Sequence, residues 1–149
     1  MSRLRESLIE LIRRTSAEIP DDVQSAILRG LEQEKEGTIA KSAMEIIERN
    51  IGLAKSKSQP ICQDTGSILF YVDCPVGLNQ VEFGQEAREA VKEATQLGYL
   101  RQNSVDSITG KNDGTNLGPG SPNLHFHQHA EDDIPVRLVL KGGGCENVG

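Results

Sequence analysis

The sequence predicts an α+β fold, with an N-terminal helical layer over residues 1–58 and a mixed α/β region with a small sheet over residues 59–149. Two observations support this prediction. Before residue 58, apolar residues recur every three or four positions, which is typical of amphipathic helices. After Pro60 they form short, partly β-branched runs, which are typical of strands. A chain of 149 residues is expected to form a single domain.

Three helices are expected in the first part. Their apolar stripes lie within residues 4–12, 23–31 and 40–51. Pro20, followed by two aspartates, is a typical start for the second helix, and Gly37 marks its end. Charged residues fill the opposite faces of these helices. We therefore expect a helical layer with no chemistry of its own.

The second part is expected to hold three strands and one helix. The predicted strands cover residues 67–72, 124–129 and 134–140, and the predicted helix covers residues 86–97. Between them lies a polar segment, residues 103–123, with four glycines and two prolines. A polar segment of this length inside a compact domain usually has a function or is disordered.

The composition excludes several kinds of partner. The net charge is −6, and residues 61–149 hold six Lys/Arg against twelve Asp/Glu. Without a basic stripe, we expect no nucleic-acid binding. No apolar run approaches the ~20 residues of a membrane span, and the N-terminus is too charged for a secretory signal. The expected location is therefore cytoplasmic, where the three cysteines are free thiols or metal ligands.

The chain has little bulky apolar material for a core. Its apolar fraction is 36%, and aromatic residues make up 3%. The sequence also ends directly after a glycine-rich turn. We therefore expect a truncated domain, or one piece of a homo- or hetero-oligomeric assembly, part of whose surface is covered by a partner.

The stretch CQDTG, residues 62–66, is the first candidate site. Cys62 has the chemistry of an iron ligand or a nucleophile, and Asp64 that of an acid/base group. Pro60 and Gly66 place both residues in a loop at a strand edge, where binding residues often lie. The structural alternative is an Asx or Ser/Thr turn with a buried bystander thiol.

Two further segments are candidates for anion binding. Arg101 begins a polar, Asn-rich stretch, and its planar guanidinium suits a carboxylate. The run KGGGCEN begins at Lys141 and exposes backbone N–H groups, although the order of a P-loop is missing. Both segments have a plain interpretation as solvated turns.

Three histidines alternate along a predicted strand and therefore share one of its faces. With two nearby aspartates they could bind a metal, but such histidines more often line a polar strand face. The residues concerned are His125, His127, His129, Asp132 and Asp133.

Taken together and in this order, these segments resemble the N-terminal (alpha) part of the class I fumarate hydratase and L-tartrate dehydratase family. The motifs that carry the resemblance are CQDTG, the Arg-x-Asn-Ser-x-x-Asp stretch from Arg101 with its GKN-x-G-x-N continuation, and KGGGxEN after a strand. It runs from about residue 5 to 149. It implies an iron–sulfur hydro-lyase with a 4Fe–4S cluster, a dicarboxylate substrate, and a beta subunit or C-terminal beta domain.

The resemblance also implies roles for particular residues. Cys62 would be the first of three thiolates that hold the cluster, which leaves one iron open to substrate. Asp64 would be the proton-transfer carboxylate and, with Gln63, would contact the substrate. Arg101 would bind a substrate carboxylate, and Gly143 would offer it a backbone N–H.

The family's other two cluster cysteines lie beyond its KGGG motif. Cys74, which we expect to be a buried thiol at a strand end, and Cys145 are not at those positions. This chain alone is therefore expected to hold no intact cluster and to be inactive.

The leading hypothesis is a hydro-lyase component that interconverts malate and fumarate, or tartrate and oxaloacetate. One alternative is a non-catalytic module that binds a small anion or a metal. Another is hydrolysis by a Cys62–His127 pair, for which no orienting residue is evident.

Overall fold

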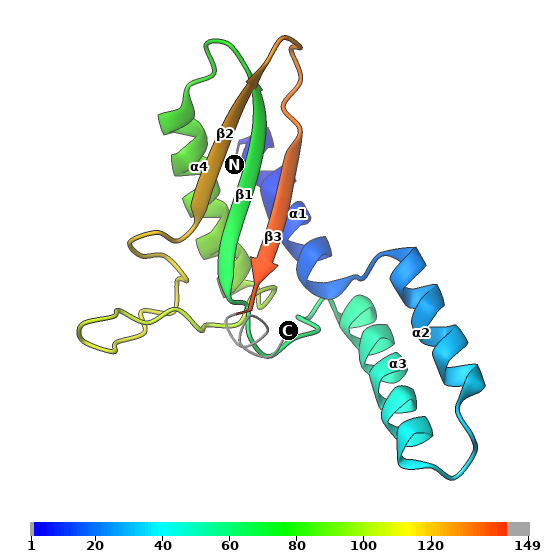
Figure 1. Cartoon of the computed structure of the whole chain (residues 1–149). Helices are drawn as coiled ribbons and strands as arrows, with labels where there is room; N and C mark the ends of the chain where they lie inside the picture. Colours follow the sequence, from blue (N-terminus) through cyan, green and yellow to red (C-terminus); the bar gives the residue numbers. More distant parts are fainter. Residues whose placement is uncertain (1, 143–149) are drawn as a thin grey trace.

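A mixed three-stranded sheet forms the centre of the structure, a computed structural model that describes residues 2–142 (Figure 1). The strands β1 (Ser67–Pro75), β2 (Asn123–His129) and β3 (Val136–Lys141) lie in the order β2-β1-β3. β1 is parallel to β2 and antiparallel to β3. The parallel pair needs a crossover connection, which α4 (Gln80–Gln96) supplies. This arrangement confirms the predicted α+β fold.

Two helices, α4 and α1 (Arg3–Ala17), lie side by side against one face of the sheet. Residues of β1 alternate between buried and less buried, so every second side chain points into this core. Cys74 is one of them, which confirms the predicted buried thiol at a strand end. The buried core consists of Leu8, Ile12, Ile68, Phe70, Val72, Cys74, Phe83, Ala87, Ala90, Val91, Ala94 and Leu100.

The observed element boundaries differ from the predicted ones mainly in α4. The helix begins at Gln80 rather than at residue 86, because the side chain of Asn79 caps it by accepting from the Glu82 N–H at 3.2 Å. Gly84 is then an interior helix residue. A Cβ there would lie 3.4 Å from Leu124 Cδ1 on β2, which is an ordinary van der Waals contact, so the helix packs on β2 at this position without requiring a glycine. β1 also continues to Pro75, because its last residues pair with β2.

The helices α2 (Asp21–Gln33) and α3 (Ile39–Lys57) form a hairpin that projects away from the sheet (Figure 1). None of the described residues of α2 is buried, and α3 buries only Ile51 and Ala54. Of the three predicted helices, α1 therefore lies on the sheet, while α2 and α3 pack mostly on each other. Within residues 2–142, every helix is too short or too polar to span a bilayer.

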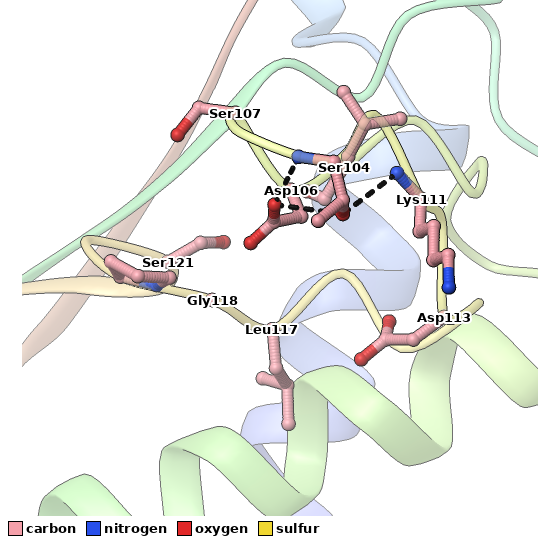
Figure 2. Close-up of a pocket in the computed structure, with 11 residues that line it drawn as sticks. Ser104, Asp106, Ser107, Lys111, Asp113, Leu117, Gly118 and Ser121 are labelled. Atoms are coloured by element: carbon pink, nitrogen blue, oxygen red, sulfur yellow. Dashed lines mark hydrogen bonds between the residues drawn. The ribbon is translucent and has the colours of Figure 1, made fainter.

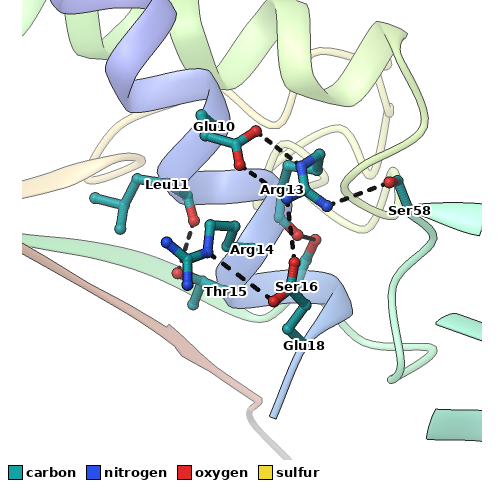
Figure 3. A network of polar contacts seen from close by, with 8 residues as sticks. All are labelled: Glu10, Leu11, Arg13, Arg14, Thr15, Ser16, Glu18 and Ser58. Atoms are coloured by element: carbon teal, nitrogen blue, oxygen red, sulfur yellow. Dashed lines mark hydrogen bonds and ion pairs between the residues drawn. The ribbon is translucent and has the colours of Figure 1, made fainter. Parts of the chain in front are cut away.

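A polar network around Arg13 joins the end of α1 to the base of this hairpin (Figure 3). The guanidinium contacts both carboxylate oxygens of Glu10 at 2.8 Å and Glu18 at 3.1 Å, and it donates to Ser58 Oγ at 3.3 Å. The hydrogen bond with Glu10 is the main reason that the pKa of Arg13 is raised. Ser58 caps α3 in the left-handed conformation, with φ +50°. The network therefore fixes the start of the segment that leads to Cys62.

Candidate active site at the loop end of the sheet

The CQDTG loop connects α3 to β1 and is held at its beginning by backbone hydrogen bonds. The Gln59 N–H donates to the carbonyl of Ala54 at 3.0 Å, and the Ile61 N–H donates to that of Ser16 at 2.9 Å. The Asn50 side chain also donates to the Ile61 carbonyl at 3.3 Å. The chain is thus fixed on both α1 and α3 immediately before Cys62.

Asp64 forms the predicted local turn, and the cysteine beside it is nevertheless accessible. One carboxylate oxygen of Asp64 accepts from the Gly66 N–H at 2.8 Å, which is an Asx turn. Cys62, Gln63 and Asp64 are all exposed, so Cys62 is not a buried bystander. The turn and an accessible functional loop therefore coexist in the same residues.

Gly66 brings this loop directly against the end of β3. Its φ is +65°, and a Cβ at this position would lie 1.9 Å from the carbonyl oxygen of Lys141 and 2.6 Å from the backbone nitrogen of Gly142. No side chain fits in that space. The CQDTG loop therefore meets the first glycine of the KGGG motif through backbone contact alone.

Thr65 links the loop to the segment that contains Arg101. This threonine is buried, and its hydroxyl accepts from the Arg101 N–H at 2.7 Å and donates to the Arg101 carbonyl at 3.2 Å. The Thr65 N–H donates to Asn103 Oδ1 at 3.0 Å, and the Asn103 side chain donates to the Gln63 carbonyl at 3.3 Å. The first two candidate segments are thus joined into one structure.

Asn116, the last residue of the GKN-x-G-x-N continuation, holds the other side of the Arg101 segment, a role that the sequence did not predict. The residue is 1% exposed and has φ +57°. Its Oδ1 accepts from the backbone N–H groups of Asn103 and Ser104, both at 3.1 Å. Its Nδ2 donates to the Arg101 carbonyl at 2.7 Å and to Thr95 Oγ1 at 3.1 Å. Two sequence signals point to this residue, namely its place in that motif and the tolerance of asparagine for left-handed backbone.

Cys62 and Asp64 open onto a common hollow of about 290 Å³. Gly142 also lines it, so two of the candidate segments contribute to one surface. Gln63 and Arg101 are exposed beside it but are not part of its lining, and Gly143 lies outside the described residues. The lining residues are Thr15, Ser16, Glu18, Ile19, Pro60, Ile61, Cys62, Asp64, Thr65, Leu140 and Gly142.

The guanidinium of Arg101 has no hydrogen-bond or ion-pair partner within residues 2–142, although its backbone is bonded to both Thr65 and Asn116. The backbone is therefore fixed while the cation remains available. A fixed backbone and an unpaired guanidinium suit recognition of an anion.

A second pocket, of about 430 Å³, lies within the long polar segment (Figure 2). Asp106 organises it by accepting from the Thr109 N–H at 2.7 Å, the Thr109 hydroxyl at 2.8 Å and the Ile108 N–H at 3.1 Å. These hydrogen bonds, the Thr109 N–H first, lower the pKa of Asp106. These donors follow Asp106 by two or three residues and so stabilise a turn. Turns of this kind explain how residues 103–122 keep a defined path without helix or strand.

The histidines of β2 are not arranged as a three-histidine site. His125 stacks on Tyr71 with ring centroids 4.8 Å apart, and His127 is exposed. Among the described residues, the ligand atoms that come within 4.8 Å of one another belong to His129, Glu131 and Asp133. His129 Nε2 also lies 2.9 Å from the Asp133 carbonyl oxygen. This local contact accounts for the proximity of His129 and Asp133.

The fold and the site together define a class of protein: an α+β chain in which the CQDTG loop, an Asn-rich segment and the first glycine of the KGGG motif meet at one end of a small sheet. Residues 5–149 match the family model described as fumarate hydratase (Fumerase). The chain therefore belongs to the family of class I fumarate hydratases and L-tartrate dehydratase alpha subunits.

Two relatives illustrate this membership. A Geobacillus stearothermophilus protein, provisionally named fumarate hydratase class I, is 47% identical over 99% of this chain and 29% of its own length. The L(+)-tartrate dehydratase subunit alpha of Escherichia coli K12 is 30% identical over 97% of this chain and 48% of its own length. The chain thus spans less than half the length of these two relatives.

Replacing Thr65 by valine should loosen the link between the two candidate segments. The change keeps the shape but leaves the Arg101 N–H without its acceptor, and a lost buried hydrogen bond of this kind costs about 1–3 kcal/mol. We expect a lower free energy of unfolding in urea and faster hydrogen exchange at the Arg101 amide. Thr65→Ser keeps the hydroxyl and should preserve the amide protection. Unchanged exchange at Arg101 in the valine variant would contradict the assignment.

Proposed function

We propose that this chain is the alpha-type component of a hydro-lyase that reversibly dehydrates a 2-hydroxy dicarboxylate, either malate to fumarate or tartrate to oxaloacetate. The observation that carries the proposal is the hollow lined by Cys62, Asp64 and the backbone of Gly142. Dehydration of a 2-hydroxy acid needs a Lewis acid, a proton-transfer group and donors for the substrate in one place. Cys62 can hold the group that acts as the Lewis acid, Asp64 can transfer the proton, and the backbone of Gly142 can donate to the substrate.

The residues present fit one corner of a 4Fe–4S cluster. Cys62 is exposed in an open loop, so its thiolate can reach a bulky group without rearrangement of the core. Cys74 is buried near the opposite end of β1, roughly 20 Å along the strand at about 3.3 Å per residue. It does not fit as a second ligand, so the remaining thiolates come from outside residues 2–142. When bound, the cluster supplies a Lewis acid for the departing hydroxyl.

Asp64 would transfer the carbon-bound proton of the substrate. One of its carboxylate oxygens is bonded to the Gly66 N–H at 2.8 Å, which orients the group. The other oxygen has no partner within the described residues and is free to take up a proton. A positioned carboxylate contributes about 10²–10⁴-fold to such a step.

Arg101 would bind one substrate carboxylate through its unpaired guanidinium, while Gln63 and the Gly143 N–H would complete the contacts from this chain. A dicarboxylate carries a second negative charge. We propose that a beta subunit or beta domain supplies the cation that binds this second carboxylate. The relatives named alpha subunits support such a partner. We continue to expect a cytoplasmic location.

The test is anaerobic reconstitution, with iron and sulfide, of the complete alpha-type protein together with its beta component, assayed on both fumarate and tartrate. Cys62→Ser should abolish the brown cluster absorbance. Asp64→Asn should keep that absorbance and lower kcat at least about 100-fold. The matched control Cys74→Ala removes the buried thiol and should keep both properties.

Two results would contradict the proposal. A cluster that survives Cys62→Ser would remove Cys62 from the ligand set. Full activity in Asp64→Asn would remove the carboxylate from proton transfer.

The 149 residues alone should show no turnover. Zinc that is bound by them as isolated and lost on His129→Ala would instead favour the metal-binding module.

A further inference from the structure

The end of α1 contributes three polar side chains to the hollow that Cys62 and Asp64 share. They belong to Thr15, Ser16 and Glu18, and Glu18 is also the residue at which the helix ends. The helix was expected to have no chemistry of its own, and the dehydration proposed above involves none of the three. We call these three residues the acceptor wall, because their hydrogen bonds decide what this part of the hollow can bind.

The acceptor wall presents oxygen acceptors to the hollow and no side-chain donors. The Thr15 hydroxyl donates its proton to the Leu11 carbonyl at 2.8 Å, and the Ser16 hydroxyl donates to the Arg13 carbonyl at 3.1 Å (Figure 3). Each hydroxyl oxygen keeps lone pairs that can accept. The Glu18 carboxylate, paired with Arg13 at 3.1 Å, only accepts. A polar ligand group that contacts this wall must therefore donate a hydrogen bond.

The electrostatics of the acceptor wall disfavour a substrate carboxylate. The negative end of the α1 dipole lies at Glu18, where the helix ends. Glu18 and Asp64 both line the hollow, and among the described residues no lysine or arginine does. Arg13 compensates the Glu18 charge only in part, because it also contacts both oxygens of Glu10 at 2.8 Å. Substrate carboxylates are therefore expected outside this wall, on the side of Arg101, which is exposed beside the hollow.

A second substrate hydroxyl is the group that suits the acceptor wall. In the proposed reaction, one carbon loses its proton to Asp64 while its neighbour loses hydroxide, and the electrons of the broken C–H bond form the C=C bond. Tartrate carries a second hydroxyl on the carbon that loses the proton, so this hydroxyl lies beside Asp64 and remains on the enol that tautomerises to oxaloacetate. Malate has a hydrogen in that place. The second hydroxyl is uncharged and can donate, as the wall requires.

We propose that Thr15 and Glu18 form a specificity site for the second hydroxyl of a 2,3-dihydroxy dicarboxylate, which makes tartrate the preferred substrate over malate. Both side chains are half-buried in the lining of the hollow, whereas Ser16 is only 8% exposed. A site built to bind a substrate hydroxyl disfavours the analogue that lacks it, because its polar groups then lose their partner. The inference rests on the proposed hydro-lyase function and names its substrate.

Steady-state kinetics of the complete reconstituted enzyme on tartrate and malate test this site. The wild type should have a kcat/KM for tartrate at least about tenfold above that for malate. Thr15→Val keeps the shape without the acceptor and should lower this ratio about threefold to tenfold. Glu18→Gln should lower it at least about tenfold, because hydrogen bonds to charged groups are stronger. Thr15→Ser retains the hydroxyl and should retain the ratio.

Glu10→Gln is the matched control for Glu18→Gln. Glu10 pairs with the same Arg13, but it does not line the hollow. The control thus loses an ion pair of the same network and should leave the ratio of tartrate to malate unchanged. A wild type that prefers malate, or a ratio that stays the same in Thr15→Val and Glu18→Gln, would overturn the specificity site and leave the hydro-lyase function intact.

Binding calorimetry separates this site from the reaction itself. The complete protein that carries Asp64→Asn is titrated with tartrate and with malate, so that affinity is measured without turnover. Tartrate should bind at least about tenfold more tightly, and adding Thr15→Val should remove most of the difference. That result would support the hydroxyl site even if the wild type turned over neither acid, in which case the hydro-lyase function alone would fail. Equal affinity for the two acids would overturn the site.

Discussion

Replacing Gly66 by alanine is expected to be the most damaging single-methyl change at the candidate site. Alanine in the left-handed conformation costs about 1–2 kcal/mol, and displacing packed atoms costs about 1–3 kcal/mol more. Here the displaced atoms are backbone, because the added Cβ would lie 1.9 Å from the Lys141 carbonyl oxygen. We expect urea unfolding to show a loss of about 3 kcal/mol or more. The loop of Cys62 should also separate from the end of β3.

Gly110→Ala is the matched control for this prediction. Its φ of +67° is almost the same as that of Gly66, but nothing lies within 4 Å of the added Cβ. It should therefore lose only the conformational cost of about 1–2 kcal/mol. The difference between the two variants measures the close approach alone. Equal losses would show that the contact between Gly66 and Lys141 does not constrain the folded chain.

Replacing Asn116 by glycine should release the segment that carries Arg101. Glycine accepts the φ of +57° without strain, so the effect reports the lost side chain. The variant removes four hydrogen bonds, to the N–H groups of Asn103 and Ser104, the Arg101 carbonyl and Thr95 Oγ1. The Asn103 N–H and the Arg101 carbonyl still bond to each other at 3.0 Å, so the Ser104 N–H is the backbone group that loses its acceptor. At about 0.5–1.5 kcal/mol for each lost hydrogen bond, we expect a loss of about 3 kcal/mol. Hydrogen exchange at the Ser104 amide should accelerate.

Asn112→Ala provides the comparison in the same polar segment. Asn112 also bonds on both sides, to the Gln102 carbonyl and the Gly114 N–H, each at 2.7 Å, but it is exposed. Water can replace these partners, so the loss should stay below about 1 kcal/mol. If Asn112→Ala were as costly as Asn116→Gly, burial would not be the reason for the importance of Asn116.

Local sequence patterns were sufficient to predict the elements and the candidate loops. The alternation of apolar residues marks β1, and the turn chemistry of Asp64 and Gly66 marks the loop before it. The start of α4 was predicted too late, at residue 86, because Gly84 reads as a helix breaker. The cap by Asn79 and the packing of Gly84 opposite Leu124 on β2 place this residue inside the helix, and the second of these is a contact between distant segments.

The sequence by itself determined the family, the α+β class and the identity of the exposed groups, because short motifs and periodicity are properties of neighbouring residues. Only the tertiary structure decided which of these groups meet. Hydrogen bonds of Thr65 and Asn116 bring Arg101 to the CQDTG loop, and a glycine without a Cβ lets that loop contact β3. These contacts join residues that are far apart in the chain. Their formation depends on the packed sheet and not on local propensity.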